Sequence, residues 1–325
     1  MKLKRRIDTV LAAVLTVAAA AIVYFAALPR DCSVFKTAFP IMGTVAEISV
    51  YSENKLNTAF KLCKAEFDAV NNICSIFSKD SELSRINASA FDNPVKCSDE
   101  MWYLLMRSKE AFIESGGKFD ITVKPLMDLW GFYRARSTEP TKDEIEAVMK
   151  KVGFDKLILD KKAKTIRFSV QGMALDMGGI AKGYAVDRAA KALISDGIKS
   201  GIINLGGNLK LLPEAPENKK FYSIGIKNPE NKDEPLPEVL KVEPDSALST
   251  SGDYERFVIY SGIRRSHIIS PKTGYPATES SVTVIAKNAV DADIFSTSAY
   301  LGGKVCAAKL NALYPDTGFY FAGDN

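Results

Sequence analysis

The segment Asp176-Met177-Gly178-Gly179-Ile180-Ala181-Lys182-Gly183 leads directly into a predicted helix over residues 180–194. Its paired glycines have no Cβ atoms, so the backbone there can approach a ligand closely, and Lys182 offers an ammonium group to a phosphate. The spacing matches neither a Walker loop nor Gly-x-Gly-x-x-Gly, and a glycine pair by itself names no ligand. The segment therefore predicts a glycine turn between a strand and a helix, suited to an anionic ligand.

Helices and strands follow one another in mixed order on both sides of this turn. Hydrophobic periodicity and capping residues predict helices at about 56–73, from Ser98 to Gly116, after the capping box Thr141/Glu144, at 180–194 and from about Asp291 onward. Strands are expected at 44–50, 157–159, 165–170, 201–205, 222–226, 257–260 and 281–285, with the rest of 213–244 in loops. This order favours an α+β fold over a doubly wound sheet, and no composition break divides residues 32–325 into two domains.

The first 31 residues differ in composition from the rest of the chain. Residues 10–28 carry no charge and follow the cluster Lys2, Lys4, Arg5 and Arg6. A helix of this length nearly spans the roughly 30 Å hydrocarbon core of a bilayer, and the basic cluster favours the cytoplasmic side. A buried core helix is the alternative interpretation.

We expect residues 1–31 to form a basic region followed by a membrane anchor or signal segment. Pro29, Arg30 and Asp31 resemble neither a small-residue cleavage site nor a lipobox before Cys32, which favours a retained anchor over cleavage or lipidation. The domain over residues 32–325 is then expected at the cell membrane, on its extracytoplasmic face.

The charge of the chain bears on its partners. The formal net charge is +4, and the first 31 residues alone hold five basic and two acidic side chains. Little net charge is left for the basic patch that general nucleic-acid binding requires. Nucleic acid is therefore not expected as a partner.

His267 is the only histidine of the chain. A sole histidine excludes a histidine-rich metal centre, and the absence of Gly-x-Ser-x-Gly argues against a common hydrolase triad. If one side chain titrates near neutrality, it is this imidazole. The alternative is a structural histidine at the end of a strand.

Asp293 and Thr297 stand four residues apart at the start of the last predicted helix. This spacing places a carboxylate and a hydroxyl on one helix face, and such hard oxygen ligands suit Mg²⁺. The alternative is a plain helix N-terminus, with Asp291 as its cap and Asp293 complementing the helix dipole.

Several further segments gain meaning when they are read together and in chain order. They are Met42-Gly43-Thr44; Phe77–Asn87; Phe119–Val123 with Pro125-Leu126 and Leu129–Phe132; Leu175–Asp187; Asn204–Gly207; Thr250–Tyr254; His267-Ile268 with Pro271 and Thr273-Gly274; and Ala292-Asp293 with Thr297. In this order they resemble the ApbE-type flavin transferase family, the FAD:protein FMN transferases. The resemblance extends from Thr37 to about Gly303.

The resemblance implies an α+β, ApbE-like flavin transferase domain with a T-fold-like mixed α/β core that binds FAD. It implies an enzyme that uses Mg²⁺, moves FMN from FAD onto a threonine of another protein and releases AMP. With an outward-facing membrane anchor, the expected acceptor is an exported or membrane redox subunit. Such a transfer needs charge neutralisation at the phosphates and a base near the incoming hydroxyl.

The site residues of the family carry over to matching positions of this sequence. The FAD contacts fall on Met42, Phe77, Lys118, Phe119, Asp120, Asp176, Lys182 and Ile268. The metal ligands fall on Asp293, Thr297 and a backbone carbonyl of the glycine turn, assigned to Gly179. His267 matches the family histidine, which deprotonates or orients the accepting threonine.

Two positions depart from the family pattern. Ser270 stands where the family usually has Asp in His-Ile-x-Asp-Pro; if that carboxylate orients the histidine or supports a turn, Ser270 does so more weakly, which concerns the transfer rate rather than FAD binding. Phe77 replaces a frequent Tyr, which keeps an aromatic wall but removes a hydroxyl.

Two other functions would use the same residues. One is a Mg²⁺-dependent FAD pyrophosphatase, in which water takes the place of the threonine and gives FMN and AMP. The other is a non-catalytic protein that binds or stores flavin. His267 and the complete Asp293/Thr297 pair favour catalysis over storage.

Overall fold

The computed structural model describes residues 34–227, 235–253, 256–278 and 281–322. The predicted membrane segment at 10–28 and the domain boundary after Asp31 lie outside these ranges. Within these ranges, no helix combines the length and the apolar character that crossing a bilayer requires. The body of the chain forms one unit from Phe35 onward.

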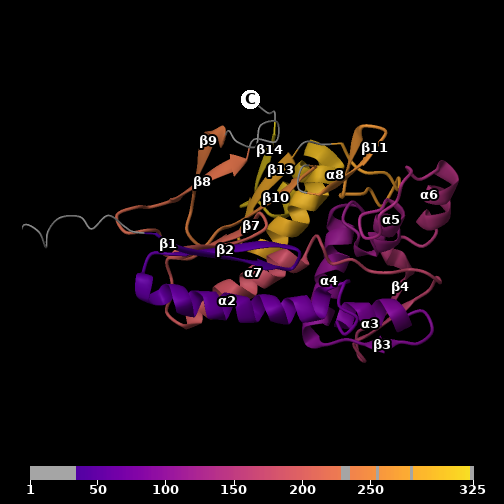
Figure 1. Cartoon of the computed structure of the whole chain (residues 1–325), viewed down its shortest axis with the longest axis horizontal. Coiled ribbons are helices and arrows are strands. Elements are labelled where there is room, and N and C mark those ends of the chain that lie inside the picture. Colours follow the sequence, from indigo (N-terminus) through magenta and orange to yellow (C-terminus); the bar gives the residue numbers. More distant parts are fainter. Residues whose placement is uncertain (1–33, 228–234, 254–255, 279–280, 323–325) are drawn as a thin grey trace, which may run out of the picture. The chain divides into compact units, whose positions relative to one another are not determined.

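A seven-stranded antiparallel sheet forms the centre of this unit (Figure 1). Its strands lie in the order β1 (Phe35–Ile41), β2 (Thr44–Val50), β6 (Gly201–Leu205), β7 (Asn208–Leu211), β10 (Ala247–Gly252), β13 (Ser281–Ala286) and β14 (Gly318–Phe321). Gly206 and Gly207 form the two-residue turn between β6 and β7, and both have positive φ, as such tight hairpin turns require. The mixed α/β architecture expected from the sequence is confirmed.

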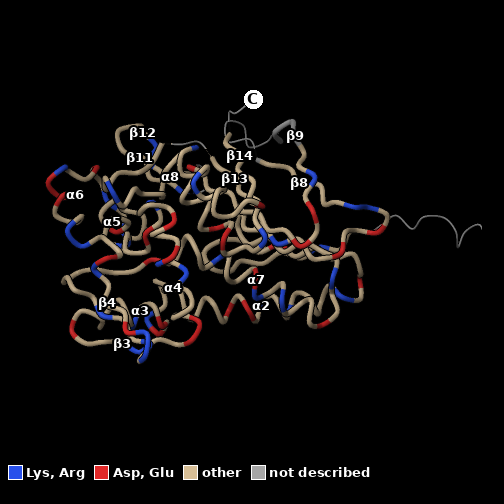
Figure 2. Tube along the Cα trace, turned by 180° about the vertical axis from the view of Figure 1, so that it is seen from behind, with Lys and Arg blue, Asp and Glu red and all other residues tan. Residues whose placement is uncertain are grey.

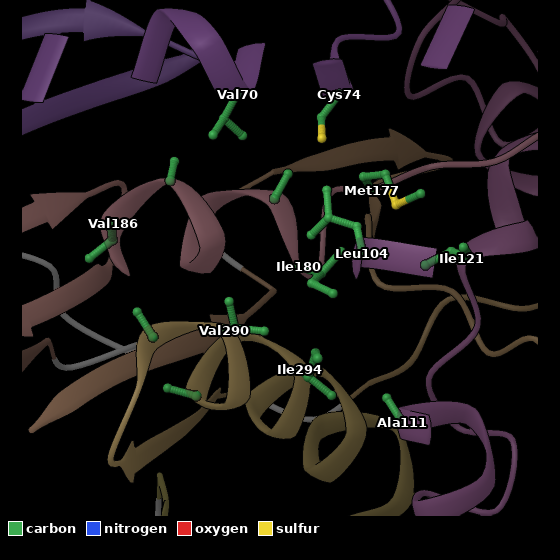
Figure 3. Packing of buried hydrophobic residues seen from close by; sticks show 14 of the residues in the cluster. Val70, Cys74, Leu104, Ala111, Ile121, Met177, Ile180, Val186, Val290 and Ile294 are labelled. Atoms are coloured by element: carbon green, nitrogen blue, oxygen red, sulfur yellow. The ribbon is translucent and has the colours of Figure 1, made fainter. Parts of the chain in front are cut away.

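Three helices pack on one face of the sheet: α2 (Glu53–Cys74), α7 (Ala181–Ser195) and α8 (Ala289–Leu313). Alternation along the strands supplies the apolar surface beneath them, since Ala46 and Ile48 of β2 are buried whereas Glu47 between them is exposed. In Figure 3, Val70 of α2 and Val290 of α8 point from opposite sides towards α7. The main core of the protein therefore lies among these helices and the sheet.

The opposite face of the sheet carries a two-stranded hairpin, β8 (Tyr222–Lys227) and β9 (Pro235–Val242). Tyr222 and Leu240 of this hairpin pack against Leu211 and Leu248 of the sheet in a separate apolar cluster. The central sheet is therefore covered by helices on one face and by this hairpin on part of the other.

A second group of elements flanks the central sheet. Its helices are α3 (Glu82–Ser89), α4 (Asp99–Glu114), α5 (Lys124–Leu129) and α6 (Lys142–Met149), with short 3₁₀ turns at Ile121–Val123 and Phe154–Lys156. Its strands are β3 (Val95–Lys96), β5 (Thr165–Phe168) and β4 (Leu157–Asp160), which form a three-stranded sheet in that order, and the hairpin β11 (Phe257–Tyr260) and β12 (Ile263–Ser266). Tyr260 of the hairpin packs with Trp130, Phe132 and Ile145 in a small core of their own.

Several local predictions are confirmed at the level of single residues. Ser98 caps α4, and its hydroxyl accepts a hydrogen bond from the amide of Met101 at 3.1 Å. The helix ends before Gly116, which has a positive φ. The capping box of Thr141 and Glu144 is present at the start of α6.

Other predictions of secondary structure are wrong. Two elements were not predicted. The strand β1 comes before the strand at 44–50, which was expected to be the first, and the helix α3 comes before the helix at Ser98, which was expected to be the second. The stretch 213–244 contains β9 in addition to the expected strand β8. β1 contains Pro40 and β9 begins at Pro235; both strands lie at the edge of a sheet, where a residue that cannot donate a hydrogen bond is tolerated.

Two details at helix starts also differ from the predictions. Residues 169–175, before the glycine turn, form no strand, so the turn joins a loop to α7. α8 begins at Ala289, and its cap is Asn288, whose side-chain oxygen accepts a hydrogen bond from the amide of Asp291 at 2.8 Å. Asp291 is therefore not the cap of this helix.

Acidic and basic residues are interspersed along the described trace (Figure 2). Lys and Arg are frequently paired with carboxylates, as for Arg188 with Glu66 at 2.6 Å and Arg107 with Asp291 at 2.9 Å.

Candidate functional site

A cavity of about 1570 Å³ opens where the β1–β2 and β6–β7 turns meet the first turns of α7 and α8 and the segment after β12. All twelve residues predicted for the site line it: Met42, Phe77, Lys118, Phe119, Asp120, Asp176, Gly179, Lys182, His267, Ile268, Asp293 and Thr297. They come from segments far apart in the sequence, and the fold brings them to one place. This cavity is the candidate functional site.

The glycine turn at 176–183 is held in place by side chains on both sides. Asn87 of α3 binds the backbone of Leu175 twice: its amide nitrogen donates to the Leu175 carbonyl at 2.9 Å, and its oxygen accepts from the Leu175 amide at 2.7 Å. Asp176 accepts a hydrogen bond from the amide of Gly178 at 2.7 Å. Lys182, one helical turn on, donates to the carbonyl of Gly178 at 3.0 Å. The turn is therefore rigidly positioned at the wall of the cavity.

Asp293 lies buried at the contact between α7 and α8. One carboxylate oxygen accepts a hydrogen bond from the amide of Gly183 at 3.0 Å, and the other lies 3.6 Å from Nζ of Lys182. Burial raises the pKa of Asp293, and Lys182, the Gly183 amide and the side chain of Asn208 oppose this rise. A cation beside the carboxylate would favour its charged form in the same way.

The residues around Asp293 fit a magnesium ion. Thr297 follows Asp293 by one helical turn, and a Cβ atom built on Gly179 would lie 3.3 Å from the Thr297 hydroxyl oxygen, so Gly179 lies beside this hydroxyl. Asn208 next to them has a buried side-chain oxygen with no hydrogen-bond partner. Carboxylate, hydroxyl and carbonyl oxygens are ligands that Mg²⁺ prefers. Within the described ranges, no group of three His, Cys, Asp or Glu side chains could hold a metal.

His267 follows β12, and the backbone of Arg256 fixes its ring. The carbonyl oxygen of Arg256 accepts hydrogen bonds from the His267 amide and from Nδ1 of its ring, both at 3.0 Å. Since a carbonyl can only accept, Nδ1 carries the proton and Nε2 is left as an acceptor. Burial lowers the pKa of His267 to about 4; the positive charges of Lys182 and Arg256 act in the same direction, and the hydrogen bond to the Arg256 carbonyl opposes them. The imidazole is therefore a neutral base at pH 7.

Ser270 supports a turn. Its hydroxyl accepts hydrogen bonds from the amides of Lys272 and Thr273, each at 3.3 Å. An aspartate at this position could orient the histidine or support a turn. In this chain residue 270 supports the turn, and the carbonyl of Arg256 orients His267. The replacement therefore does not remove a partner from the histidine in this chain.

An aromatic wall borders the cavity near Asp176. The ring of Phe77 is 69% exposed and meets the ring of Tyr133 edge to face, with 5.5 Å between the centroids. The hydroxyl of Tyr133 donates to the carboxylate of Asp176, and burial together with that carboxylate raises the pKa of Tyr133. The guanidinium of Arg256 lies 5.0 Å from the Tyr133 ring centroid and donates to the Phe132 carbonyl at 2.6 Å.

The segment 118–120 enters the cavity wall through a polar loop. The hydroxyl of Ser115 accepts hydrogen bonds from the amides of Lys118 at 3.2 Å and Phe119 at 3.0 Å. Both carboxylate oxygens of Asp120 are bound inside the protein, one to the amide and hydroxyl of Thr122 and the other to the amide of Phe154. Asp120 therefore holds two loops together beneath the cavity.

Three residues that shape the site were not predicted from the sequence: Tyr133, Asn208 and Arg256. Tyr133 follows the predicted block that ends at Phe132, and Arg256 follows the block that ends at Tyr254, so block boundaries excluded both. Asn208 comes directly after the Gly206-Gly207 turn, where a polar residue was consistent with a simple hairpin. Only their contacts in the folded chain reveal their place in the site.

Comparisons with known proteins agree with this arrangement. The model of the ApbE family matches residues 42–321. Two curated relatives named "FAD:protein FMN transferase" are each 31% identical: one from Klebsiella pneumoniae, over 284 residues, with 86% of this chain and 86% of the relative covered, and one from Vibrio cholerae, over 300 residues, with 89% and 87% covered.

Solved structures of similar proteins show the same fold. The ApbE protein from Thermotoga maritima superimposes with a TM-score of 0.79 at 28% identity, with 90% of this chain and 97% of that chain covered. The flavin transferase ApbE from Vibrio cholerae gives a TM-score of 0.77 at 28% identity, with 89% and 94% covered. The resemblance found in the sequence blocks is thereby confirmed, and this chain belongs to the ApbE family.

Proposed function

We propose that this chain is a Mg²⁺-dependent FAD:protein FMN transferase that attaches FMN to a threonine of another protein and releases AMP. The observation that carries the proposal is that a neutral base, a cation site and an aromatic wall line one cavity, through His267, the Asp293/Thr297 pair and Phe77. Membership of a family whose curated relatives are named FAD:protein FMN transferase supports the transferase class.

In this mechanism His267 accepts the proton of the incoming threonine. Nδ1 is already a donor to the Arg256 carbonyl, so the free Nε2 atom is the acceptor, and the low pKa keeps it unprotonated at pH 7. The threonine oxygen attacks the phosphorus of the FMN half of FAD. The new bond joins this oxygen to FMN, the bond between the two phosphates breaks, and AMP leaves with the bridging oxygen.

Gly179, Asp293 and Thr297 would hold the magnesium ion through a carbonyl, a carboxylate and a hydroxyl oxygen. When bound, such an ion neutralises charge on the two phosphates of FAD. Lys182, 3.6 Å from Asp293, supplies a second positive charge at the same wall. The site thus gathers cationic groups where an anionic leaving group must be stabilised.

The aromatic wall is suited to the flavin half of the substrate. Phe77 presents a largely exposed ring, and Tyr133 behind it is fixed by Asp176 and by the guanidinium of Arg256. An exposed ring that rests on a fixed one offers a planar apolar surface to an isoalloxazine ring. We assign the FAD contacts on this basis to Met42, Phe77, Lys118, Phe119, Asp176, Lys182 and Ile268, all of which line the cavity, with Asp120 supporting them from beneath.

The proposal includes a position in the cell. Residues 10–28 carry no charge and follow a basic cluster, which supports a retained anchor with the domain on the extracytoplasmic face. The acceptor is then an exported or membrane redox subunit. Protease added to intact cells should degrade the domain, whereas a domain that faces the cytoplasm would be protected.

The activity is tested with the full chain purified in detergent. The chain is incubated with FAD, Mg²⁺ and a threonine-bearing redox subunit, and flavin fluorescence on a denaturing gel is compared with AMP release. A fluorescent acceptor band with matching AMP, absent when the acceptor threonine is changed to alanine, is expected. AMP and free FMN without a band would indicate a pyrophosphatase, and bound FAD with neither product would indicate a storage protein.

A further inference from the structure

Tyr133 stands between the two parts of the cavity wall that carry the proposed chemistry. On one side its hydroxyl donates to Oδ2 of Asp176, at the start of the glycine turn. On the other side the guanidinium of Arg256 lies 5.0 Å from its ring centroid, and the carbonyl of Arg256 holds the amide and Nδ1 of His267. Tyr133 therefore links the segment that fixes the base to the turn that would hold the cation.

The ring of Tyr133 is held by contacts on several sides. Besides Arg256, the ammonium group of Lys124 lies 5.4 Å from the ring centroid, and the ring of Phe77 meets it edge to face at 5.5 Å. A cation within about 6 Å of an aromatic centroid is attracted to the ring face. Arg256 also donates to the carbonyl of Phe132, the chain neighbour of Tyr133, at 2.6 Å. These contacts fix the ring, and with it the direction of the hydroxyl.

Asp176 passes this position on to the backbone of the glycine turn. Its Oδ2 atom accepts from Tyr133, and its Oδ1 atom accepts from the amide of Gly178 at 2.7 Å. The amide of Asp176 donates to the carbonyl of Ile121 at 2.7 Å, which holds its main chain. A carboxylate turns easily about its terminal torsion, so the Tyr133 hydroxyl is what keeps Oδ1 directed at the Gly178 amide.

The backbone that follows Gly178 is closely packed. A Cβ atom built on Gly179 would lie 3.0 Å from Cε2 of Phe119 and 3.3 Å from the hydroxyl oxygen of Thr297. Mg²⁺ demands a near-ideal octahedral arrangement of oxygens at about 2.0–2.1 Å. The affinity for the ion should therefore depend on how firmly the turn holds the Gly179 carbonyl.

We propose that Tyr133 is a positioning residue for the cation site: its hydroxyl orients Asp176, which holds the glycine turn and the Gly179 carbonyl in the arrangement that binds Mg²⁺. The inference rests on the proposed function, because it concerns the cation of that reaction. Tyr133 acts through Asp176 and does not bind the ion itself. Loss of the hydroxyl therefore weakens the affinity for Mg²⁺ and leaves the affinity for the acceptor unchanged.

The test removes single hydroxyl groups from the full chain purified in detergent. Tyr133→Phe keeps the ring and its contacts but removes the donor to Asp176. Tyr260→Phe is the matched control, since Tyr260 belongs to the small core against which Tyr133 packs and does not line the cavity. Its hydroxyl donates to the Trp130 carbonyl at 2.8 Å, so this variant also loses one hydrogen bond. Urea unfolding verifies that both variants are folded.

Mg²⁺ binding is measured in two ways. Calorimetry in the presence of FAD gives the affinity directly, and transfer rates at increasing Mg²⁺ give the concentration for half-maximal activity. Both should show about tenfold weaker binding for Tyr133→Phe, as expected when one hydrogen bond to a charged group is lost. The rate at saturating Mg²⁺ and KM for the acceptor should stay within about twofold of wild type. A smaller folded fraction alone would lower the rate at every Mg²⁺ concentration and leave the half-maximal concentration unchanged.

A double-mutant cycle tests the route through Asp176. Asp176→Ala removes the acceptor of the Tyr133 hydroxyl and should weaken Mg²⁺ binding at least as much as Tyr133→Phe does. Adding Tyr133→Phe to Asp176→Ala should then weaken it by less than about twofold more. Unchanged Mg²⁺ binding in Asp176→Ala, or a further tenfold loss in the double variant, would overturn the proposed route.

The remaining outcomes separate the two proposals. Wild-type Mg²⁺ binding in a folded Tyr133→Phe variant would overturn the positioning role and leave the transferase function intact. An equal loss in Tyr260→Phe would overturn it as well, because the effect would then come from the small core and not from Asp176. If the wild-type chain neither binds Mg²⁺ nor transfers FMN, the proposed function fails, and the positioning role falls with it.

Discussion

The carbonyl oxygen of Arg256 accepts hydrogen bonds from both the amide and the ring Nδ1 of His267, each at 3.0 Å. Two bonds to one backbone atom fix the direction of the ring and its tautomer. In a Ser-His-Asp triad a carboxylate accepts the hydrogen bond from Nδ1 of the histidine, whereas here a main-chain carbonyl accepts it. The histidine is therefore positioned by the base of the hairpin β11–β12, and side chains around it act mainly on its charge.

The first prediction concerns the pH dependence of transfer. In the proposed mechanism the neutral imidazole is the active form, and the pKa of His267 is about 4, so kcat/KM should fall only below pH about 4 instead of near 6.5. Removing a neighbouring positive charge with Lys182→Gln should raise the pKa of His267 and move this acid limb upward. Rates measured with saturating Mg²⁺ from pH 3.5 to 8 test it. An acid limb centred near 6.5 in wild-type chain would contradict the lowered pKa of His267.

The variant His267→Ala separates chemistry from binding. Loss of the base should reduce transfer by about 10²- to 10⁴-fold, while FAD affinity changes little because in the proposed mechanism Nε2 binds the acceptor hydroxyl and not FAD. FAD binding is measured by quenching of flavin fluorescence, and transfer by gel fluorescence. Full transfer activity in this variant would remove His267 from the mechanism.

The third prediction concerns Ser270. Its hydroxyl accepts hydrogen bonds only from two turn amides in the described contacts, at 3.3 Å each, so an aspartate there should strengthen the turn without contacting the histidine. Ser270→Asp should leave the turnover number within about twofold of wild type and raise stability by about 0.5–1 kcal/mol, as for a stronger acceptor of backbone amides. Urea unfolding and steady-state rates check the two halves. A large gain in turnover would mean that the aspartate acts on His267.

The fourth prediction concerns the cation site. Asp293→Asn keeps an oxygen that can accept from the Gly183 amide but removes the negative charge. Turnover should then fall on the order of a hundredfold, and the Mg²⁺ concentration for half-maximal activity should rise, because the cation at the proposed site would lose the Asp293 carboxylate as a ligand. Calorimetry of Mg²⁺ binding in the presence of FAD is the direct measurement. Unchanged Mg²⁺ dependence would place the ion elsewhere.

Much of the fold could be predicted from the sequence where local signals are strong. Nearby residues suffice to predict three helices, through the amphipathic stripe of α2, the cap at Ser98 and the capping box at Thr141. Edge strands such as β1 and β9 contain proline, and their pairing is decided by distant partners, so local pattern does not reveal them.

The candidate site shows the same division. Its residues could be predicted because sequence segments match the ApbE family in the same order. The proximity of Gly179 and Thr297 depends on the packing of α7 against α8. Tyr133 and Arg256 could not be predicted, since their roles consist of contacts with Asp176 and His267 across more than ten residues of chain. The turn role of Ser270 required the observed hydrogen bonds as well.

The last prediction tests the contact between α7 and α8 that delivers Asp293 to the cavity. A Cβ atom on Gly183 would lie 2.2 Å from the carbonyl oxygen of Ala289 and 2.9 Å from Cβ of Asp293, so the two helix starts must separate in Gly183→Ala. We expect a loss of about 1–3 kcal/mol or more in the free energy of unfolding and weaker Mg²⁺ binding, because the amide of Gly183 would withdraw from Asp293. Gly225→Ala is the control, since its Cβ would meet no atom within 4 Å and its stability should change by less than about 0.5 kcal/mol. If both variants unfold at the wild-type urea concentration, the close approach of the two helices is not what positions Asp293.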